Sequence, residues 1–207
     1  MLSGEQVLCI GCGMALPETG YHHIADNETA LRFAGRIPFR YATSFAYFNN
    51  EGLLQHLLHG LKYQDKEDIG LFLGRRFGTA LANTGWLKEI DLIIPVPLHP
   101  AKKAKRGYNQ SMLIAKGMGA ILNKPVSDDI LVRTRDTESQ THKTRTERVN
   151  NMADAFRLAE KGILAGKHIL ICDDVLTTGA TIEACALALL AEENIKISIG
   201  TIGIAVS

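Results

Sequence analysis

The sequence predicts an α/β fold in which a parallel sheet is flanked by helices, and three observations lead to that prediction. Short apolar runs such as residues 91–98 and 168–172 have the length and composition of buried strands. Longer segments between such runs carry apolar residues at the three- and four-residue spacing of helices. Strands that alternate with helices in this way favour parallel pairing through right-handed crossover connections.

Composition and charge indicate a cytoplasmic protein. The chain has 207 residues, which fit one domain with a small appendage, and its 46% hydrophobic and 22% charged residues are ordinary for a globular protein. The 23 basic and 22 acidic residues give a net charge of +1, which argues against binding nucleic acid through bulk charge. The sequence has no apolar run long enough for a membrane span and no signal-like N-terminus, so we expect no membrane partner. Four cysteines without a secretory signal indicate a reducing compartment.

The first half of the chain is predicted to hold an irregular segment followed by two helices. We expect residues 1–45 to form an N-terminal segment separate from a main domain at 46–207. Leucines recur at helical spacing in "GLLQHLLHGLKY", residues 52–63, and predict a helix there. A second helix is predicted over "IGLFLGRRFGTALANTGWL", residues 69–87, although its glycines weaken the helical pattern.

Strands and helices alternate through the second half. A buried strand is predicted over "DLIIPVPL", residues 91–98, stopping at Pro95 or just after it. A helix follows over residues 109–123, capped by Asn109 or Ser111. The remaining predicted elements are a strand at 166–174, a helix at 181–194 and a strand at 196–206. Residues 133–148 contain no aliphatic or aromatic side chain, so they form either an idle surface loop or a mobile lid.

An acidic pair followed by a threonine-rich loop marks the candidate site, in "ILICDDVLTTGAT", residues 169–181. The strand brings Asp173 and Asp174 to the carboxyl edge of the sheet, where ligands bind in open α/β folds. The helix that begins near Ala180 or Thr181 turns its N-terminus toward the same place, and its unpaired N–H groups suit an anion. Carboxylates accept hydrogen bonds from hydroxyls beside that anion, so the pattern indicates a sugar phosphate. An ordinary helix cap would need neither two aspartates nor three threonines.

The same stretch resembles the phosphoribosyl pyrophosphate (PRPP) motif of type I phosphoribosyltransferases. Three further stretches resemble the ComF family of competence-associated phosphoribosyltransferase-like proteins: "IIPVPLHPAKKAKRGYNQS", "FAYFNNEGLLQHLLHGLKY" and "QTHKTRTERVNNMADAF". In addition, "CIGC" followed by "LPETGYH" resembles the end of that family's zinc-ribbon-like module. These similarities cover most of the chain from residue 9 onward. They imply a type I phosphoribosyltransferase-like parallel sheet preceded by the remnant of a zinc-ribbon-like module.

The resemblance also implies a role for each part of the site. The catalytic pair Asp173 and Asp174 would hold the ribose hydroxyls. The 5′-phosphate would be bound by Thr177, Thr178, Gly179, Ala180 and Thr181. Pyrophosphate would lie against the turn of Val96, Pro97 and Leu98, with its charge countered by Lys102, Lys103 and Arg106. A flexible loop would close over the ligand with Lys143, Arg145 and Arg148. A Mg²⁺ ion would bridge pyrophosphate and ribose oxygens.

Two classes of function follow from these similarities. The first is an enzyme that binds PRPP with Mg²⁺ and transfers the phosphoribosyl group to an unknown acceptor, releasing pyrophosphate. The second is a non-enzymatic accessory of competence or DNA uptake that uses the fold as a ligand sensor or as a platform for proteins or single-stranded DNA. The basic run at 102–106 with Tyr108 nearby would suit such DNA by combining charge with stacking. A homodimer is common in this fold class, but the sequence reveals neither the oligomeric state nor the acceptor.

The cysteines fall into two groups. Cys9 and Cys12 form half of a tetrahedral zinc site, to which His22 or His23 could add ligands. Family members carry a second such pair upstream, so a longer chain could complete the site, and we expect this chain to bind less than one Zn²⁺ per molecule. Cys172 and Cys185 lie in apolar segments and are predicted to be core residues.

Overall fold

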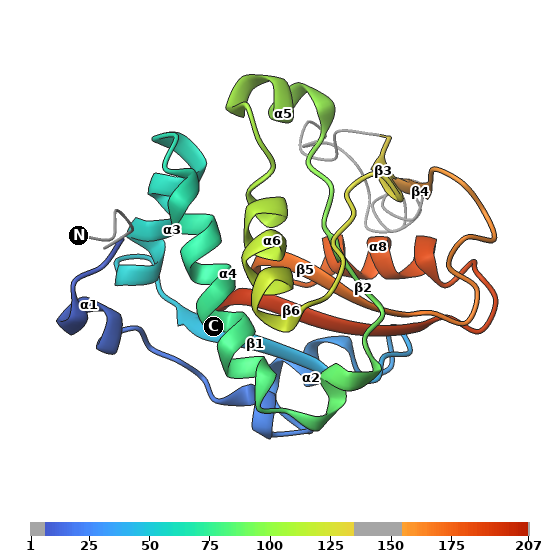
Figure 1. The fold of residues 1–207 in the computed structure, drawn as a ribbon, viewed down its shortest axis with the longest axis horizontal. Coiled ribbons are helices and arrows are strands. Elements are labelled where there is room, and N and C mark those ends of the chain that lie inside the picture. The colour runs from blue at the N-terminus through green and yellow to red at the C-terminus, as the bar shows by residue number, and fades with distance from the viewer. Residues whose placement is uncertain (1–6, 135–154, 207) are drawn as a thin grey trace.

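The fold is built around a four-stranded parallel sheet (Figure 1). The computed structural model describes residues 7–134 and 155–206. The strand order is β1-β6-β5-β2, and all three neighbouring pairs run parallel. The strands are β1 (Ala42–Phe48), β2 (Leu92–Pro95), β5 (His168–Leu176) and β6 (Lys196–Ala205). This arrangement confirms the predicted α/β class.

Helices cover both faces of the sheet (Figure 1). One face packs against α3 (Leu53–Tyr63), α4 (Glu67–Ala82) and α6 (Gln110–Leu122). The other packs against α2 (Glu28–Phe33) and α8 (Ala180–Leu189). Successive residues of β5 point to alternate faces, so Leu170 and Cys172 join the first core while Ile169 and Ile171 join the second. Each of these four side chains is fully buried, which makes β5 the centre of the fold.

Shorter elements surround this framework. A small antiparallel sheet pairs β3 (Leu131–Arg133) with β4 (Phe156–Leu158). The other elements in the described part of the chain are α1 (Ile10–Met14), η1 (Tyr21–His23), η2 (Gly85–Glu89) and α5 (Pro100–Arg106). Cys172 and Cys185 are buried, as the sequence predicts.

The predicted irregularity of residues 1–45 is wrong. This segment contains α1, η1 and α2, and its last four residues already belong to β1. The expected boundary between residues 45 and 46 therefore falls inside a strand of the sheet. Helix α2 forms because the side chain of Asn27 caps it by accepting a hydrogen bond from the N–H of Ala30, and Phe33 then packs in the core.

Two other boundaries differ from the sequence prediction. The basic run at 102–106, for which the sequence predicts no helix, is part of helix α5. Pro100 occupies the start of this helix and Gly107, with φ of 85°, ends it, which is the usual placement of both residue types. The helix predicted over 69–87 ends at Ala82, and a separate 3₁₀ turn, η2, follows it.

Candidate active site

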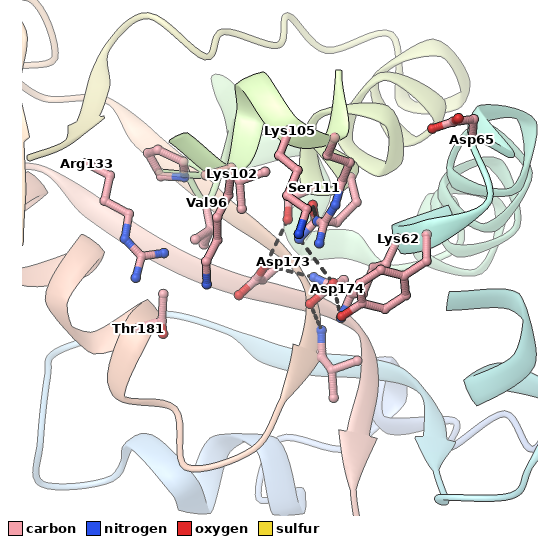
Figure 2. Close-up of a pocket in the computed structure, with 16 residues that line it drawn as sticks. Lys62, Asp65, Val96, Lys102, Lys105, Ser111, Arg133, Asp173, Asp174 and Thr181 are labelled. Carbon is pink, nitrogen blue, oxygen red and sulfur yellow. Dashed lines mark hydrogen bonds and ion pairs between the residues drawn. The ribbon is translucent and has the colours of Figure 1, made fainter. Parts of the chain in front are cut away.

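A cavity of about 700 Å³ opens at the carboxyl end of the sheet (Figure 2). Strand β5 forms its floor and contributes the two aspartates. The last turn of α3, helix α5 and the first turn of α6 form its walls. Arg133 from β3 reaches the cavity on one side of the two aspartates, and Lys62 lies on the other side (Figure 2). The cavity therefore joins segments that are far apart in the sequence.

Asp173 is a buried carboxyl whose pKa is raised to about 7, so both its protonated and its ionised forms occur near neutral pH. Its side chain is only 9% exposed, and its Oδ1 accepts hydrogen bonds from the Ser111 hydroxyl at 2.8 Å and from the N–H of Asp174 at 2.9 Å. Burial, followed by the charge of Asp174, raises the pKa of Asp173 to about 7, although the Ser111 hydrogen bond opposes the rise. Asp173 can therefore either donate or accept a hydrogen bond at physiological pH.

Asp174 is held by a lysine from another part of the chain. Its Oδ2 lies 2.7 Å from Nζ of Lys62 and accepts a longer hydrogen bond, 3.3 Å, from the side-chain amide of Gln110. Its Oδ1 accepts from the N–H of Val175 at 2.6 Å. A buried carboxylate with these partners is kept in one orientation, facing the cavity.

The threonine-rich turn lies between β5 and α8. Gly179, at φ of 78°, precedes the first helical residue, Ala180. Its conformation is left-handed, which suits glycine. Thr181 lines the cavity, and the exposed Thr177 and Thr178 form the turn beside it. The Thr178 hydroxyl accepts a hydrogen bond from the N–H of Ala180 at 3.4 Å. The helix N-terminus and the hydroxyls thus meet at one place, as an anion site requires.

Arg32 of α2 and Arg36, which follows that helix, support this turn from its carbonyl side. Arg32 donates to the carbonyl oxygen of Thr177 at 2.7 Å, and Arg36 donates to that of Thr178 at 2.8 Å. Arg36 also forms an ion pair with Glu183 on the first turn of α8. The N-terminal segment is therefore part of the scaffold of the turn, a role that the sequence did not reveal.

The basic helix α5 presents only part of its charge to the cavity. Lys102 and Arg106 line the cavity together with the turn of Val96, Pro97 and Leu98. Lys103, expected here from the sequence, instead forms a 3.5 Å ion pair with Asp128, and Lys105 lines the cavity. The reason is helical geometry: Lys105 and Arg106 lie three and four residues after Lys102 and share its face, whereas Lys103 directly follows Lys102 and projects from another side of the helix.

The sequence missed several residues that line the cavity. They are Lys62, Tyr63, Asp65, Lys105, Gln110, Ser111 and Arg133. Gln110 and Ser111 follow the helix cap at Asn109, so their place at the start of α6 could have been read from the cap. Lys62 and Tyr63 end a leucine-rich helix, and nothing local in that helix links them to an acidic pair more than a hundred residues later.

The remaining predicted residues do not complete a second site within the described part of the chain. Lys143, Arg145 and Arg148 lie outside the described residues. Cys9 caps α1 and its Sγ accepts from the N–H of Cys12 at 3.4 Å. Both cysteines are exposed, and in residues 7–134 and 155–206 no group of three or more His, Cys, Asp or Glu side chains is arranged to hold a metal ion. Among these same residues, no helix is long and apolar enough to cross a membrane.

Comparisons with known proteins identify relatives in sequence. The phosphoribosyl transferase domain family matches residues 108–207. DNA utilization protein YhgH of Shigella flexneri is 34% identical over 140 residues, which are 66% of this chain and 61% of that protein. Competence protein F of Haemophilus influenzae is 32% identical over 134 residues, 63% of this chain and 58% of that protein. The chain thus spans about three fifths of the length of the curated relatives it matches.

Solved structures that align with this chain have lower sequence identity to it. The glutamine PRPP amidotransferase of B. subtilis aligns over 68% of this chain and 30% of that chain, with 17% identity and a TM-score of 0.45. The domain match and the parallel sheet with its flanking helices confirm the predicted type I phosphoribosyltransferase-like fold. The zinc-ribbon-like origin of the N-terminal segment stays a prediction.

Proposed function

We propose a function for this chain from its membership of the ComF family and from its phosphoribosyl transferase domain. The chain binds PRPP together with Mg²⁺ and transfers the phosphoribosyl group to an acceptor, releasing pyrophosphate. One observation carries the proposal. Two buried aspartates lie at the carboxyl end of the sheet, in a cavity whose opposite wall is basic and whose edge is a helix N-terminus. Hydroxyl acceptors and anion sites are thereby combined in one place.

Each part of PRPP has matching groups in this cavity. The 5′-phosphate fits the turn at 177–181, where N–H groups at the start of α8 and threonine hydroxyls can donate to it. The ribose hydroxyls fit the carboxyls of Asp173 and Asp174, which accept hydrogen bonds. The pyrophosphate fits the side of the cavity formed by residues 96–98 and the cations of α5.

The donor set also suits Mg²⁺. This cation prefers carboxylate oxygens and substrate phosphates as ligands, and it retains several waters. In the cavity floor, the carboxylate oxygens come from Asp173 and Asp174. When bound, the ion would neutralise charge on the pyrophosphate. Oδ2 of Asp174 is already paired with the ammonium group of Lys62. For Mg²⁺ to bind here, that ammonium group must move or the ion must use a different carboxylate oxygen.

The transfer itself needs positioning and charge rather than a nucleophilic side chain. The bond between the anomeric carbon and the pyrophosphate oxygen breaks, and its electron pair leaves with pyrophosphate. Positive charge then develops on the ribose ring near the aspartates, while Lys102, Lys105 and Arg106 face the departing anion. The acceptor's electron pair forms the new bond to the anomeric carbon, and its proton passes to solvent or pyrophosphate. The loop with Lys143, Arg145 and Arg148 remains part of the proposal as a cover that excludes water.

A second candidate function is binding of single-stranded DNA in support of competence or DNA uptake. The observation that favours it is an exposed aromatic ring beside a cation: Tyr63 is 69% exposed, and the guanidinium of Arg106 lies 5.7 Å from its ring centre. Such pairs stack on bases without sequence preference. Tyr108, which the sequence suggested for this role, is partly buried and donates its hydroxyl to the carbonyl of Leu61.

Calorimetric titration separates the two candidates. PRPP with Mg²⁺ should bind the wild-type chain with micromolar affinity and should not bind the Asp173→Asn, Asp174→Asn double variant, which must first be shown to fold. Tyr63→Ala is the matched variant for DNA, since it removes the exposed ring and leaves the acidic pair. Pyrophosphate release in a screen of acceptors would establish transfer. A folded wild-type chain that ignores PRPP but loses oligonucleotide binding in Tyr63→Ala would favour the DNA role.

A further inference from the structure

A second cavity, of about 260 Å³, lies at the other end of the sheet. Its walls come from residues 21–25, which include η1, and from residues 39–43, which lead into β1. Strand β1 runs parallel to β5, so its first residues lie at the amino end and the acidic pair lies toward the carboxyl end. The two cavities have no lining residue in common. The second cavity is thus separate from the candidate active site.

Two buried polar atoms on this cavity have no hydrogen-bond partner among the described residues. Thr43 is 1% exposed, and its hydroxyl is one of them. The other is Nδ1 of His22. Leaving a buried polar group unpaired costs about 1–3 kcal/mol, so native structures rarely keep two at one place without a partner for them. Both residues line the cavity, although the two atoms themselves are closed off from solvent, so each side chain has to turn toward the cavity for a ligand to pair with it.

The other walls of the cavity are aromatic and rigid. Tyr21, Phe39 and Tyr41 line it. The Tyr21 ring meets Tyr47 edge-on at 5.8 Å, and the Tyr41 ring stacks on His168 with 6.4 Å between ring centres. Because each of these two rings is held by a neighbour, a ligand would not have to order them on binding.

One buried amide fixes the two walls to each other. The side-chain nitrogen of Asn27 donates to the carbonyl oxygens of Tyr21, Ile24 and Ala42, at 3.2, 2.7 and 2.8 Å. Asn27 is 4% exposed. The first two carbonyls belong to one wall and the third to the other, so the width of the cavity is set by a polar cluster and not by flexible contacts.

We propose that this cavity is a binding site for a flat heteroaromatic ring of the nucleobase class. Aromatic walls offer stacking surfaces, while the hydroxyl of Thr43 and the ring nitrogen of His22 offer hydrogen bonds to polar atoms on the ring edge. The volume lies below the roughly 300–1,000 Å³ of sites for drug-sized ligands. A base fits that volume, and a sugar or phosphate attached to it would extend past the exposed Arg40 at the cavity. The proposal does not depend on PRPP binding at the other cavity.

Two-dimensional NMR of the ¹⁵N-labelled chain tests the proposal, with adenine and uracil as probes and toluene as an apolar ring. A base should shift the amide signals of residues 21–25 and 39–43 and leave those of 96–98 and 175–181 in place. Thr43→Val keeps the shape of the side chain and removes the hydroxyl, so it should weaken base binding at least fivefold. It should leave toluene binding unchanged.

Two further variants make the outcome decisive. Ala25→Trp places a large ring on an exposed residue of the cavity wall and should abolish base binding without disturbing the core. Asp174→Asn alters only the other cavity and should leave base binding unchanged. The proposal is overturned if bases shift only the signals of the first cavity, if they shift none at millimolar concentration, or if toluene binds as well as adenine and Ala25→Trp has no effect.

Discussion

The ammonium nitrogen of Lys62 lies 2.7 Å from Oδ2 of Asp174 and joins the last turn of α3 to the central strand β5 (Figure 2). The lysine side chain is 25% exposed and the aspartate 9%, so the pair is partly shielded from solvent. It places a fixed positive charge beside two carboxyls that would otherwise repel each other. A ligand that uses Asp174 must therefore share it with Lys62.

Replacing Lys62 with methionine should affect both stability and binding. Asp174 would remain buried without its cation, so the free energy of unfolding should fall by about 1–3 kcal/mol, less than for a fully buried pair. The affinity for PRPP should fall as well, because the cavity loses a cation. Urea denaturation and calorimetry measure the two effects. Lys105→Met is the control: it removes a charge from the same cavity and should weaken PRPP binding with no comparable loss of stability. Equal stability of Lys62→Met and wild type would contradict the prediction.

The raised pKa of Asp173 predicts how stability depends on pH. Because the pKa rises from 3.8 to about 7 on folding, the folded state holds this proton more tightly than the unfolded state. The contribution of Asp173 to stability is therefore fully present below pH 4 and is lost as the pH rises through 7. The difference between the two pKa values corresponds to at most about 4 kcal/mol.

The matching variant is Asp173→Asn, whose side chain does not titrate. Between pH 4 and pH 7.5, wild type should lose stability relative to this variant, and the difference should become constant above pH 8. Urea denaturation at each pH measures it. A difference that stays flat across the whole range would show that Asp173 is ionised throughout.

The local motif was readable from the sequence, whereas its supports were not. Asp173, Asp174 and the following turn are contiguous, so strand, turn and helix signals predict their relative placement. Lys62 and Arg36 reach the site from elements that are distant in the chain, and no local pattern encodes such contacts. The tertiary contacts of these two charged side chains therefore had to be found in the structure.

Strand β1 was missed for a different physical reason. Its buried positions include Thr43 and Ser44, which read as polar and break the apolar run expected of a buried strand. In the fold, the Ser44 hydroxyl is hydrogen-bonded to those of Thr29 and Thr201, both at 2.7 Å. This network gives each of the three buried hydroxyls a hydrogen-bond partner. Because its members come from three separate segments of the chain, no local sequence pattern predicts it.

Arg36→Gln should loosen the turn at 177–179 without touching the ligand itself. The variant loses the hydrogen bond to the Thr178 carbonyl and the ion pair with Glu183. Affinity for ribose 5-phosphate should fall by about 5- to 30-fold, or about 1–2 kcal/mol, while affinity for pyrophosphate should stay the same. Arg76→Gln serves as the control, because Arg76 contacts Gly13 and Glu18 away from the turn. An equal loss for both ligands would show that Arg36 acts through general stability instead.

Thr178→Val should remove a hydroxyl donor from the proposed phosphate site. The expected cost is about 1–3 kcal/mol of binding free energy for PRPP, since the lost hydrogen bond is to a charged group. Calorimetry measures it, and Thr79→Val, which removes an exposed hydroxyl on α4, should have no effect. If Thr178→Val binds PRPP as wild type does, the phosphate does not lie in this turn.

Gly74→Ala tests why α4 contains glycines that weaken its helical pattern. A methyl group at position 74 would lie 2.1 Å from the carbonyl oxygen of Ile114 on α6, and one at Gly117 would lie 2.4 Å from the carbonyl oxygen of Leu71 on α4. The two helices therefore approach so closely that only hydrogen fits between their backbones. Alanine gains roughly 1 kcal/mol of helix propensity over glycine, but overpacking against backbone typically costs about 1–3 kcal/mol or more. Because backbone atoms cannot turn aside as a side chain can, the overpacking cost should prevail.

The expected result for Gly74→Ala is a net loss of about 1–3 kcal/mol in the free energy of unfolding, measured by urea denaturation. Gly85→Ala is the matched control, since an added methyl group there meets nothing within 4 Å. A stabilised Gly74→Ala chain would mean that α4 and α6 can separate at little cost. Since α6 carries Ser111 and Gln110 to the acidic pair, such separation would also release Asp173 from its hydroxyl partner. The destabilised variant should accordingly bind PRPP more weakly even under conditions in which it stays folded.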